Sequence, residues 1–498
     1  MNEEIEEYYE ELYRLYIDEN QPLERRYRQL RESLERVVRE KIQGNSLQTT
    51  DLAARINYVA TQYGLDLKEQ NQLHTFRLTS NDILNHRKSP VKEEFLRDLR
   101  AVAYAYRKMF AQDIPLKLFS VLPKQEIASS GKKEKMEYIR RIRVCFDYAD
   151  DTYLYVHPVD VIADELIRVV YNKPGINHEF EETIKELWRY AQLNLLDVSV
   201  DRDGIYTPSF IVLEPDYLID ISSLAECYKD YGSHPANYFL SRLVPIDNAR
   251  PLLLGNIANL FLDEWIHAGE EEPDYIDCMK KAFRQYPIEL AACAELRDPS
   301  KEKEFAKDCR MHFEHIRDVV QHTFLEPGYN LDKKEAVLEP SYICEALGIQ
   351  GRLDYMQRDM SSFIEMKSGK ADEFSMQGKV EPKENNKVQM LLYMAVLEYS
   401  MGQDRRRMHP YLLYTRYPLL YPARASWAQV RRVINLRNRI VAAEYGVQFH
   451  NHPDFTRNLL AQINPEVVNE RKLSGRFWEQ YLKPSISRFR EKLSALEP

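Results

Sequence analysis

The chain has 498 residues, of which 44% are hydrophobic and 30% are charged, and its net charge is −9. This balance is typical of a folded globular protein and excludes a disordered or fibrous chain, and the length predicts several domains. No apolar run approaches the roughly 20 residues of a membrane-spanning helix, and the acidic start Met1–Glu7 lacks the basic and apolar regions of a secretory signal. We therefore expect a cytoplasmic protein with no membrane partner.

Cysteine, glycine and charge patterns narrow the possibilities further. The six cysteines form no CxxC pair, so the sequence indicates neither a disulfide framework nor a zinc ribbon. The phosphate-binding motifs GxxxxGK(S/T) and GxGxxG are missing. From Gly351 to Pro498 there are 24 Lys and Arg against 16 Asp and Glu, which hints that this third contacts a polyanion, although ordinary solvated charge explains it equally well.

Residues 1–125 are predicted to be helical. From Leu23 to Ile42, for example, apolar residues recur every three or four positions, the period of an amphipathic helix. Residues 126–220 are predicted to form a small β-rich unit, because β-branched and aromatic residues gather in short runs there. The strand candidates in and before this unit are 116–121, 138–144, 152–156 and 209–213, with a helix expected over 179–196 and a linker over 124–135.

Residues 221–450 are predicted to form a mixed sheet flanked by helices. Helices are expected over 222–324, and the order that follows is three strands, a helix, a strand and a helix. These elements are expected at 335–338, 349–356, 362–367, 384–401, 411–416 and 426–443. The chain is therefore assigned to the α+β or α/β class, with residues 451–498 as a C-terminal helical connector.

Three charged residues in this region suggest chemistry. Strand alternation places Glu365 and Lys367 on one face of 362–367, and a hairpin turn at 357–361 can bring Asp354 beside Glu365. Two adjacent carboxylates repel unless a cation such as Mg²⁺ lies between them, and such an ion also binds substrate phosphate. Lys367 could then orient or deprotonate a water molecule, or stabilise charge on the phosphate.

The pattern alone is weak, since a solvated Glu–Lys pair on an edge strand would look the same. The surrounding residues add weight: Gln389 and Tyr393 lie four apart on the next predicted helix and share one face. Together, Gly351–Met356, Phe363–Lys370 and Gln389–Tyr393 resemble the nuclease core of the RecB-like branch of the PD-(D/E)xK superfamily. Within that branch they are similar to the nuclease module of flap-trimming replication helicase–nucleases and to CRISPR-associated RecB-like exonucleases.

The resemblance covers about residues 205–445 and implies a restriction-endonuclease-like fold. It implies that Asp354 and Glu365 bind Mg²⁺ or Mn²⁺, that Lys367 is the catalytic lysine, and that Gln389 and Tyr393 support the site and contact DNA. In the family's first motif, however, Asn259 stands where a metal-binding His is expected. An amide is a weaker ligand, and Asp263, one turn further on, could substitute for it, although an ordinary exposed carboxylate on the helix is the somewhat stronger interpretation of Asp263.

The cysteines that would bind an iron–sulfur cluster are a second departure from the family. Cys227 lies where iron–sulfur members carry their first cluster cysteine, but no cysteine follows Cys344. Because a Cys₄ cluster needs four thiolates, we expect no iron–sulfur cluster and a buried thiol at Cys227.

The resemblance also suggests the substrate. DNA contacts are expected from Lys370, Lys387, Arg431 and Arg432, and further from Lys379, Lys383, Arg405–Arg407, Arg437, Arg439, Tyr414 and Tyr417. It favours single-stranded DNA, as flaps or ends, and a helicase motor as partner, on the same longer chain or separate. The expected function is a metal-dependent deoxyribonuclease in DNA replication or repair. The alternative is a non-catalytic DNA-binding or assembly module with a degenerate site.

Overall fold

The computed structural model describes residues 3–42, 51–123, 137–160, 165–229, 231–243, 250–329, 331–374, 379–424, 426–449 and 475–494. The chain forms two compact units, one made of residues 1–214 and 444–452 and the other of residues 215–443 and 453–498. No helix in the described ranges is long and apolar enough to cross a bilayer. The expected linker over 124–135 lies outside the described residues.

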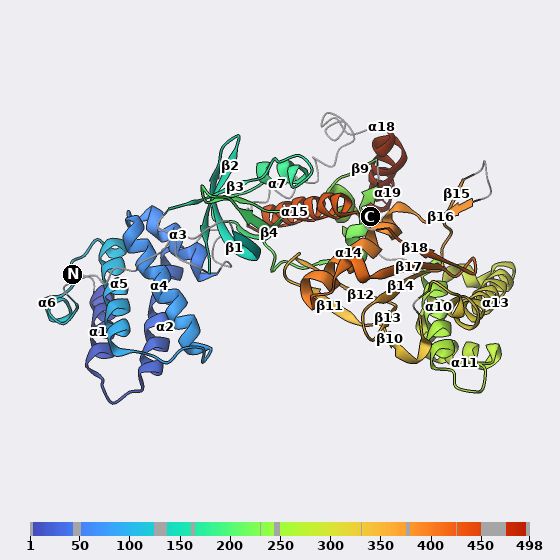
Figure 1. Ribbon diagram of the computed structural model, residues 1–498, viewed down its shortest axis with the longest axis horizontal. Helices are drawn as coiled ribbons and strands as arrows, with labels where there is room; N and C mark the ends of the chain where they lie inside the picture. Colours follow the sequence, from blue (N-terminus) through green and yellow to red (C-terminus); the bar gives the residue numbers. More distant parts are fainter. Residues whose placement is uncertain are drawn as a thin grey trace. The chain divides into compact units, whose positions relative to one another are not determined.

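A helical bundle opens the first unit (Figure 1). Its helices are α1 (Glu3–Ile17), α2 (Leu23–Lys41), α3 (Leu52–Gln62), α4 (Leu67–Leu84) and α5 (Lys92–Phe110). The helix predicted over 23–42 is confirmed, and its apolar stripe is buried in the bundle core. Asp51 and Asp66 cap the starts of α3 and α4 by accepting bonds from backbone N–H groups, which satisfies donors that the first turn leaves free.

The strand predicted over 116–121 is wrong. A single helical turn, α6 (Leu116–Phe119), forms there directly after Pro115, whose φ of −54° suits the start of a helix. Leu116 and Phe119 are exposed, so their apolar character reflects no packing against a sheet. The β-branched and aromatic residues that predicted a strand therefore carried no information on burial.

A closed sheet completes the first unit. It contains β1 (Glu137–Ala149), β2 (Tyr153–Pro158), β3 (Ile167–Val170), β4 (Gln192–Val200), β5 (Ile205–Thr207) and β6 (Phe210–Leu213). The strand order is β1-β2-β3-β5-β4, β4 pairs back to β1, and β3 and β5 run parallel. This is the order of a five-stranded OB-type barrel, in which the short helix α7 (Glu181–Lys185) lies between the third and fourth strands.

The barrel corrects the helix predicted over 179–196. Only α7 and the preceding turn are helical, because Tyr190 adopts a positive φ of 71° and donates its N–H to the carbonyl of Phe146, which turns the chain into β4. The apolar residues of 192–196 are buried in the barrel instead. The helical region and the β-rich unit, predicted as separate domains, belong to one compact unit, since Cys145, Val159 and Tyr190 join the core of the bundle.

The second unit is built on a mixed five-stranded sheet, as expected in outline. Its order is β10 (Ala336–Leu338), β13 (Tyr355–Gln357), β14 (Ser362–Lys367), β17 (His409–Tyr414) and β18 (Leu419–Pro422). Within this sheet β14 and β17 pair in parallel, and the other described pairs are antiparallel. The strand predicted over 349–356 is two strands in different sheets, since β12 (Ile349–Arg352) pairs with β11 (Ser341–Cys344) and β7 (Ile219–Asp220). Leu353 and Asp354 form the break.

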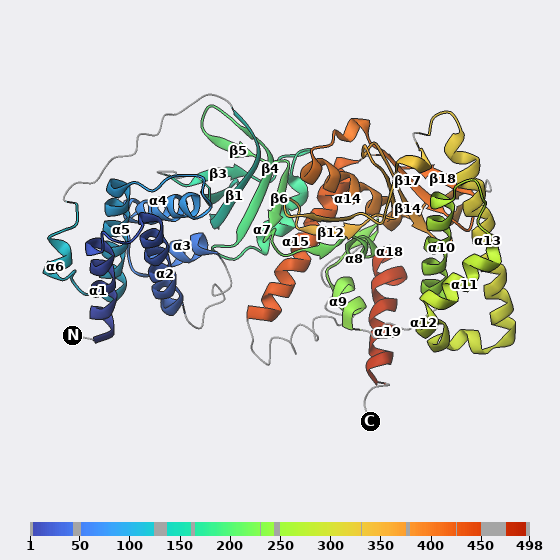
Figure 2. The ribbon, with the colours of Figure 1, turned by 90° about the horizontal axis from the view of Figure 1, so that it is seen from below.

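Helices cover both faces of this sheet (Figures 1 and 2). On one side lies α14 (Glu384–Met401), and on the other lie α10 (Arg250–His267) and α13 (Pro299–Gln321), whose apolar side chains share a core with Ile364 and Met366. The other helices of this unit include α8 (Ile221–Glu226), α9 (Ala236–Leu243), α11 (Tyr275–Gln285), α12 (Pro287–Ala292) and α15 (Trp427–Phe449). Two short ladders, β8 (Tyr228–Lys229) with β9 (Gly232–Ser233) and β15 (Asp372–Phe374) with β16 (Lys379–Glu381), complete it.

The C-terminal segment expected as a connector packs on the second unit. Residues 475–494 are helical, as α18 (Gly475–Phe477), a π-helical turn over Trp478–Leu482, and α19 (Lys483–Ser494). Their apolar side chains form a small core with Ala236 and Leu240 of α9. Residues 450–474 lie outside the described part of the chain.

His74 of α4 makes the stability of the first unit depend on pH. Its Nε2 bonds to Asn57 Oδ1 at 2.7 Å, and its Nδ1 accepts a bond from Arg77 Nε at 3.4 Å. Burial, reinforced by the Arg77 charge, lowers the pKa of His74 to about 3. The unfolded chain takes up this proton near pH 6.5, so the stability contributed by neutral His74 is complete above about pH 6.5 and falls by about 1.4 kcal/mol per pH unit towards pH 3.

We predict that His74→Gln removes this dependence. In urea unfolding of the full chain, the wild type should lose about 2 kcal/mol more than the variant between pH 6.5 and pH 5. Equal losses in the two proteins would contradict the prediction.

Candidate active site

Asp354 and Glu365 face each other across a hairpin. Strands β13 and β14 are antiparallel with Tyr355 opposite Ile364, so continuing the register by one residue sets Asp354 opposite Glu365. The backbone N–H of Met366 donates to Asp354 Oδ2 at 2.6 Å, which fixes this carboxylate against the end of β14. The prediction that a hairpin brings the two carboxylates together is confirmed.

Lys367 completes the cluster from the same strand. Its Nζ donates to Glu365 Oε1 at 2.9 Å, and Gln389 Nε2 of α14 donates to the same oxygen at 2.5 Å. The other oxygen, Glu365 Oε2, is buried and has no hydrogen-bond partner among the described residues. Because a buried carboxylate oxygen without a partner is costly, this atom is a natural ligand for a cation.

The ionisation of these groups follows from their burial. Burial raises the pKa of Asp354, although the hydrogen bond from the backbone N–H of Met366 acts to lower it. Burial and then the charge of Asp354 raise the pKa of Glu365 to about 8, against the effect of Lys367. Burial alone would lower the pKa of Lys367, but the charges of Glu365 and Asp354 outweigh it and raise that pKa. Lys367 is therefore protonated at neutral pH.

Gln389 and Tyr393 hold the site from α14. Gln389 Nε2 also donates to Ser222 Oγ at 2.9 Å, and Tyr393 Oη donates to the carbonyl of Arg352 at 2.6 Å, just ahead of the break that carries Asp354. Both side chains are buried, at 3% and 1% exposed, so their contacts are with protein atoms. A Cβ at Gly351 would lie 3.0 Å from Tyr393 Oη, which explains the glycine there. Their geometry is that of positioning residues.

The short helix α8 contributes residues that sequence reasoning missed. Besides Ser222, the charge of Asp220 acts on Glu365 and that of Glu226 acts on Lys367. Asp220 caps the start of α8, where its Oδ1 accepts a hydrogen bond from the backbone N–H of Ser223. Glu226 Oε1 accepts a bond from Asn385 Nδ2 at 2.8 Å. In the sequence this segment stood out through Cys227, which is buried as expected. No motif signalled the acidic residues.

The residues of the altered first motif lie on α10. A Cβ at Gly255 would lie 3.4 Å from Ser368 Oγ, which brings this helix near the end of β14. Burial and the nearby charges of Glu339 and Asp354 raise the pKa of Asp263 to about 6, so Asp263 lies within electrostatic reach of the site. Asn259 is one turn away, and in the described ranges neither residue is hydrogen-bonded to Asp354 or Glu365.

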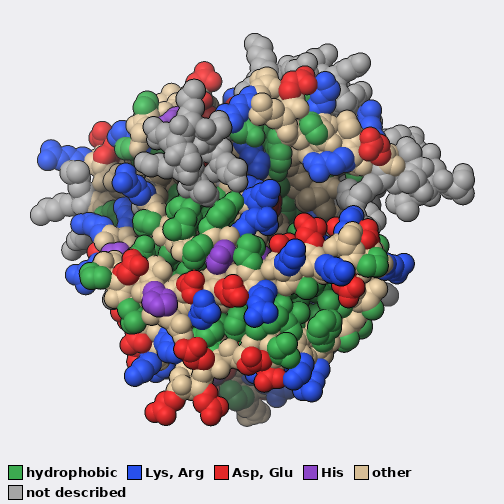
Figure 3. All heavy atoms as spheres, turned by 90° about the vertical axis from the view of Figure 1, so that its right-hand side faces the viewer, with side chains coloured by type: hydrophobic (Ala, Val, Ile, Leu, Met, Phe, Trp, Pro, Cys, Tyr) green, Lys and Arg blue, Asp and Glu red, His purple; other side chains and the backbone are tan. Residues whose placement is uncertain are grey.

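The expected DNA contacts divide into exposed and buried residues. Lys370 and Arg432 are exposed, and Lys387 is half-buried. Figure 3 shows the surface that carries α11 and α13, where Lys and Arg intermingle with Asp and Glu. A uniformly basic face is therefore absent from this side of the described surface.

Three of the expected DNA contacts are buried instead. Arg431 and Arg437 are 7% and 0% exposed, and Arg437 Nε donates to the carbonyl of Gly348 at 3.1 Å. Tyr414 is also fully buried, and its Oη accepts bonds from Lys383 N and Asn386 Nδ2. The expectation of DNA contact is wrong for these side chains, because the two arginines of α15 (Trp427–Phe449) and the tyrosine at the end of β17 are packed inside the unit. The side chain of Lys379 lies outside the described part.

The donor set at Asp354 and Glu365 fits a hard divalent cation. In the described part of the chain no group of three Asp, Glu, His or Cys residues is arranged to hold a metal. Mg²⁺, however, is often bound through one or two carboxylates, with water and substrate phosphate supplying the rest. Asp354 and the unpartnered Oε2 of Glu365 supply that pair.

Comparisons with known proteins found no relative: no protein-family model matches the chain, and no curated protein matches it.

The site predicts metal affinity that rises with pH. Because the pKa of Glu365 is raised to about 8, a cation must displace a proton at neutral pH. We expect the apparent affinity for Mn²⁺ to increase by up to about tenfold per unit between about pH 6 and pH 8. Calorimetric titration of the full chain in buffers of different ionisation enthalpy measures both the affinity and the proton release.

Asp354→Asn should weaken Mn²⁺ binding and flatten its pH dependence, because it removes both a ligand and the charge that raises the pKa of Glu365. Asp277→Asn, at an exposed carboxylate on α11, is the matched control and should bind as the wild type does. Equal affinity in all three proteins would place the ion elsewhere.

Proposed function

We propose that the chain is a metal-dependent DNA nuclease that hydrolyses phosphodiester bonds. The observation that carries the proposal is the meeting of Asp354, Glu365 and Lys367 at the end of β14, with an unpartnered carboxylate oxygen among them. The resemblance of these residues to the RecB-like nuclease core points to the same chemistry. Asp354 and Glu365 are the proposed ligands of Mg²⁺ or Mn²⁺, with Asp263 as a candidate further ligand.

Each group has a distinct role in the proposed reaction. A bound Mg²⁺ or Mn²⁺ would polarise the phosphoryl oxygen and lower the pKa of its water. Since the pKa of Lys367 is raised, its ammonium suits stabilisation of the negative charge that develops on the phosphate, in preference to removal of a proton from water. Gln389 holds Glu365 in place, and Tyr393 holds the backbone ahead of Asp354.

Charge favours the second unit as the one that contacts DNA. OB-type barrels often bind single strands through the loops after their first and fourth strands. In this barrel those loops carry the acidic residues Asp150, Asp151, Asp201 and Asp203, which would repel a phosphate backbone. We therefore assign the DNA contact to the second unit, through Lys370, Lys387 and Arg432.

The proposed substrate is single-stranded DNA, as a flap or an end. This follows from the resemblance, and a role in replication or repair beside a helicase motor is proposed on the same ground. A non-catalytic DNA-binding module is the second candidate, favoured by Asn259 at the position of the family's metal-binding His.

We predict metal-dependent cleavage that needs Lys367. With labelled single-stranded and forked DNA in Mn²⁺, the full chain should release shorter products, and EDTA should stop the reaction. Lys367→Ala should lower the rate by about 10²- to 10³-fold, because it removes one preorganised charge from the transition state. The rate is measured from product bands at saturating protein.

Lys280→Ala, at an exposed lysine on α11, serves as the control and should cleave at the wild-type rate. DNA binding without cleavage in Mg²⁺ or Mn²⁺ would refute the nuclease and favour the non-catalytic module.

A further inference from the structure

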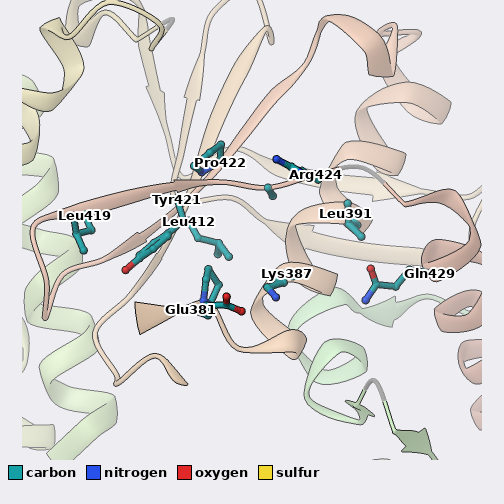
Figure 4. Close-up of a pocket in the computed structure, with 11 residues that line it drawn as sticks. Glu381, Lys387, Leu391, Leu412, Leu419, Tyr421, Pro422, Arg424 and Gln429 are labelled. Carbon is teal, nitrogen blue, oxygen red and sulfur yellow. The ribbon is translucent and has the colours of Figure 1, made fainter. Parts of the chain in front are cut away.

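A cavity of about 790 Å³ opens between α14, β17, β18 and the start of α15 (Figure 4). Its size is within the range of small-ligand sites. Leu391, Leu412 and Tyr421 are among the residues that form its apolar part, and the charged residues around it are Glu381, Lys387 and Arg424. The site described above uses none of these side chains for chemistry.

The register of the sheet relates this cavity to Glu365. In the parallel pair Glu365 lies opposite Leu412, and in the next pair Leu412 lies opposite Tyr421. Because residues in register point to the same face, Glu365 and Tyr421 project from one face of the sheet, with backbones about 10 Å apart at the usual strand spacing. The cavity therefore neighbours the candidate active site.

Helix α14 lies between the two sites. On one face of the helix, Gln389 contacts Glu365. On another face, Lys387 and Leu391, which are four residues apart, line the cavity. Two different faces of α14 therefore contribute to the two sites.

Tyr421 is the side chain that most clearly lacks a partner. Its Oη is buried and has no hydrogen bond within the described ranges. Its ring stands nearly perpendicular to that of Tyr414, at 85° with centroids 5.8 Å apart. Because the hydroxyl is buried, the part of Tyr421 that meets a ligand in the cavity is its ring.

The chemistry of the lining selects among ligands. A planar ring beside leucine side chains suits stacking of another flat, weakly polar ring. The Gln429 amide lies in the lining, where its Nε2 donates to Glu384 Oε1 and its carbonyl oxygen can accept a hydrogen bond from a polar edge of such a ring. Arg424, together with Lys387, whose Nζ also pairs with Glu384 Oε2 at 3.5 Å, supplies positive charge for a phosphate at the rim. A flat ring with polar edges that is joined to a phosphate describes a nucleotide.

We propose that this cavity binds a nucleobase of the single strand whose backbone enters the site at Asp354, Glu365 and Lys367. The base lies against the ring of Tyr421, and the adjoining phosphate is held by Arg424 and Lys387. This inference rests on the proposed function for its substrate class. It adds a second binding site for the DNA strand, beside the site of cleavage.

The test compares a deoxyadenosine oligonucleotide of about ten nucleotides, a usual span for one single-strand site, with the same sugar-phosphate chain lacking bases. Binding of each to the full chain is measured by fluorescence anisotropy in EDTA, where no cleavage occurs. We expect the wild type to bind the strand with bases about tenfold more tightly. Tyr421→Leu should remove most of that preference, whereas Tyr421→Phe, which keeps the ring, should retain most of it.

Arg424→Gln should weaken both ligands by the same factor, because it acts on the phosphate. Arg284→Gln, at an exposed arginine on α11, is the matched control and should change neither affinity. A folded Tyr421→Leu protein with an unchanged preference for bases would overturn the proposal.

A second measurement keeps the test independent of any variant. Photo-crosslinking of the wild type to strands that carry 5-iodouracil should label the peptide containing Tyr421, and labelling confined to other peptides would overturn the proposal. Loss of base preference in Tyr421→Leu with intact cleavage in Mn²⁺ separates the cavity from the reaction. Conversely, base-dependent binding without cleavage would refute the proposed nuclease activity but would still support binding of a base in the cavity.

Discussion

Removing a carboxylate from water is costly, and the second unit sets two of them opposite each other at the end of one hairpin, with Glu365 buried and Asp354 half-buried. The surroundings compensate for this only in part. Asp354 accepts one backbone N–H, and Glu365 satisfies one oxygen through Lys367 and Gln389, while its other oxygen is left without a partner in the described structure. Two carboxylates with an oxygen left unpartnered suit a cation that bridges them. The strand register, the break at Asp354 and the buried Gln389 amide of α14 all hold the two carboxylates in these positions.

Helix α14 is the element that organises the second unit around this pair. Gln389 holds Glu365 of β14, and Tyr393 holds the backbone of Arg352 at the end of β12, just ahead of Asp354. Lys387 and Leu391 line the cavity beside β17 and β18. The opposite face of the sheet is filled by the apolar side chains of α10 and α13. The sheet is thus packed rigidly on one side, and on the other it leaves room for the chemistry and for a ligand.

The local chemistry of the site could be predicted from sequence, because strand alternation and hairpin geometry act over a few residues. Asp354, Glu365 and Lys367 were placed in this way, and the spacing of Gln389 and Tyr393 was enough to set them on one helix face. Long-range packing could not be read in this way. The roles of Ser222 and Glu226 depend on α8 meeting α14, and the burial of Arg437 and Tyr414 depends on the tertiary fold. Tyr190 ended a predicted helix through a positive φ that no local pattern revealed, and the closure of the barrel followed from pairings between distant strands.

We propose that one divalent ion lies between Asp354 and Glu365. Crystals of the full chain soaked in Mn²⁺ and measured at the manganese absorption edge locate it. We expect one anomalous peak within about 2.0–2.3 Å of an oxygen of each carboxylate, the range of first-row metal–oxygen bonds. A well-ordered site with no peak, or a peak bound by only one of the two residues, would contradict it.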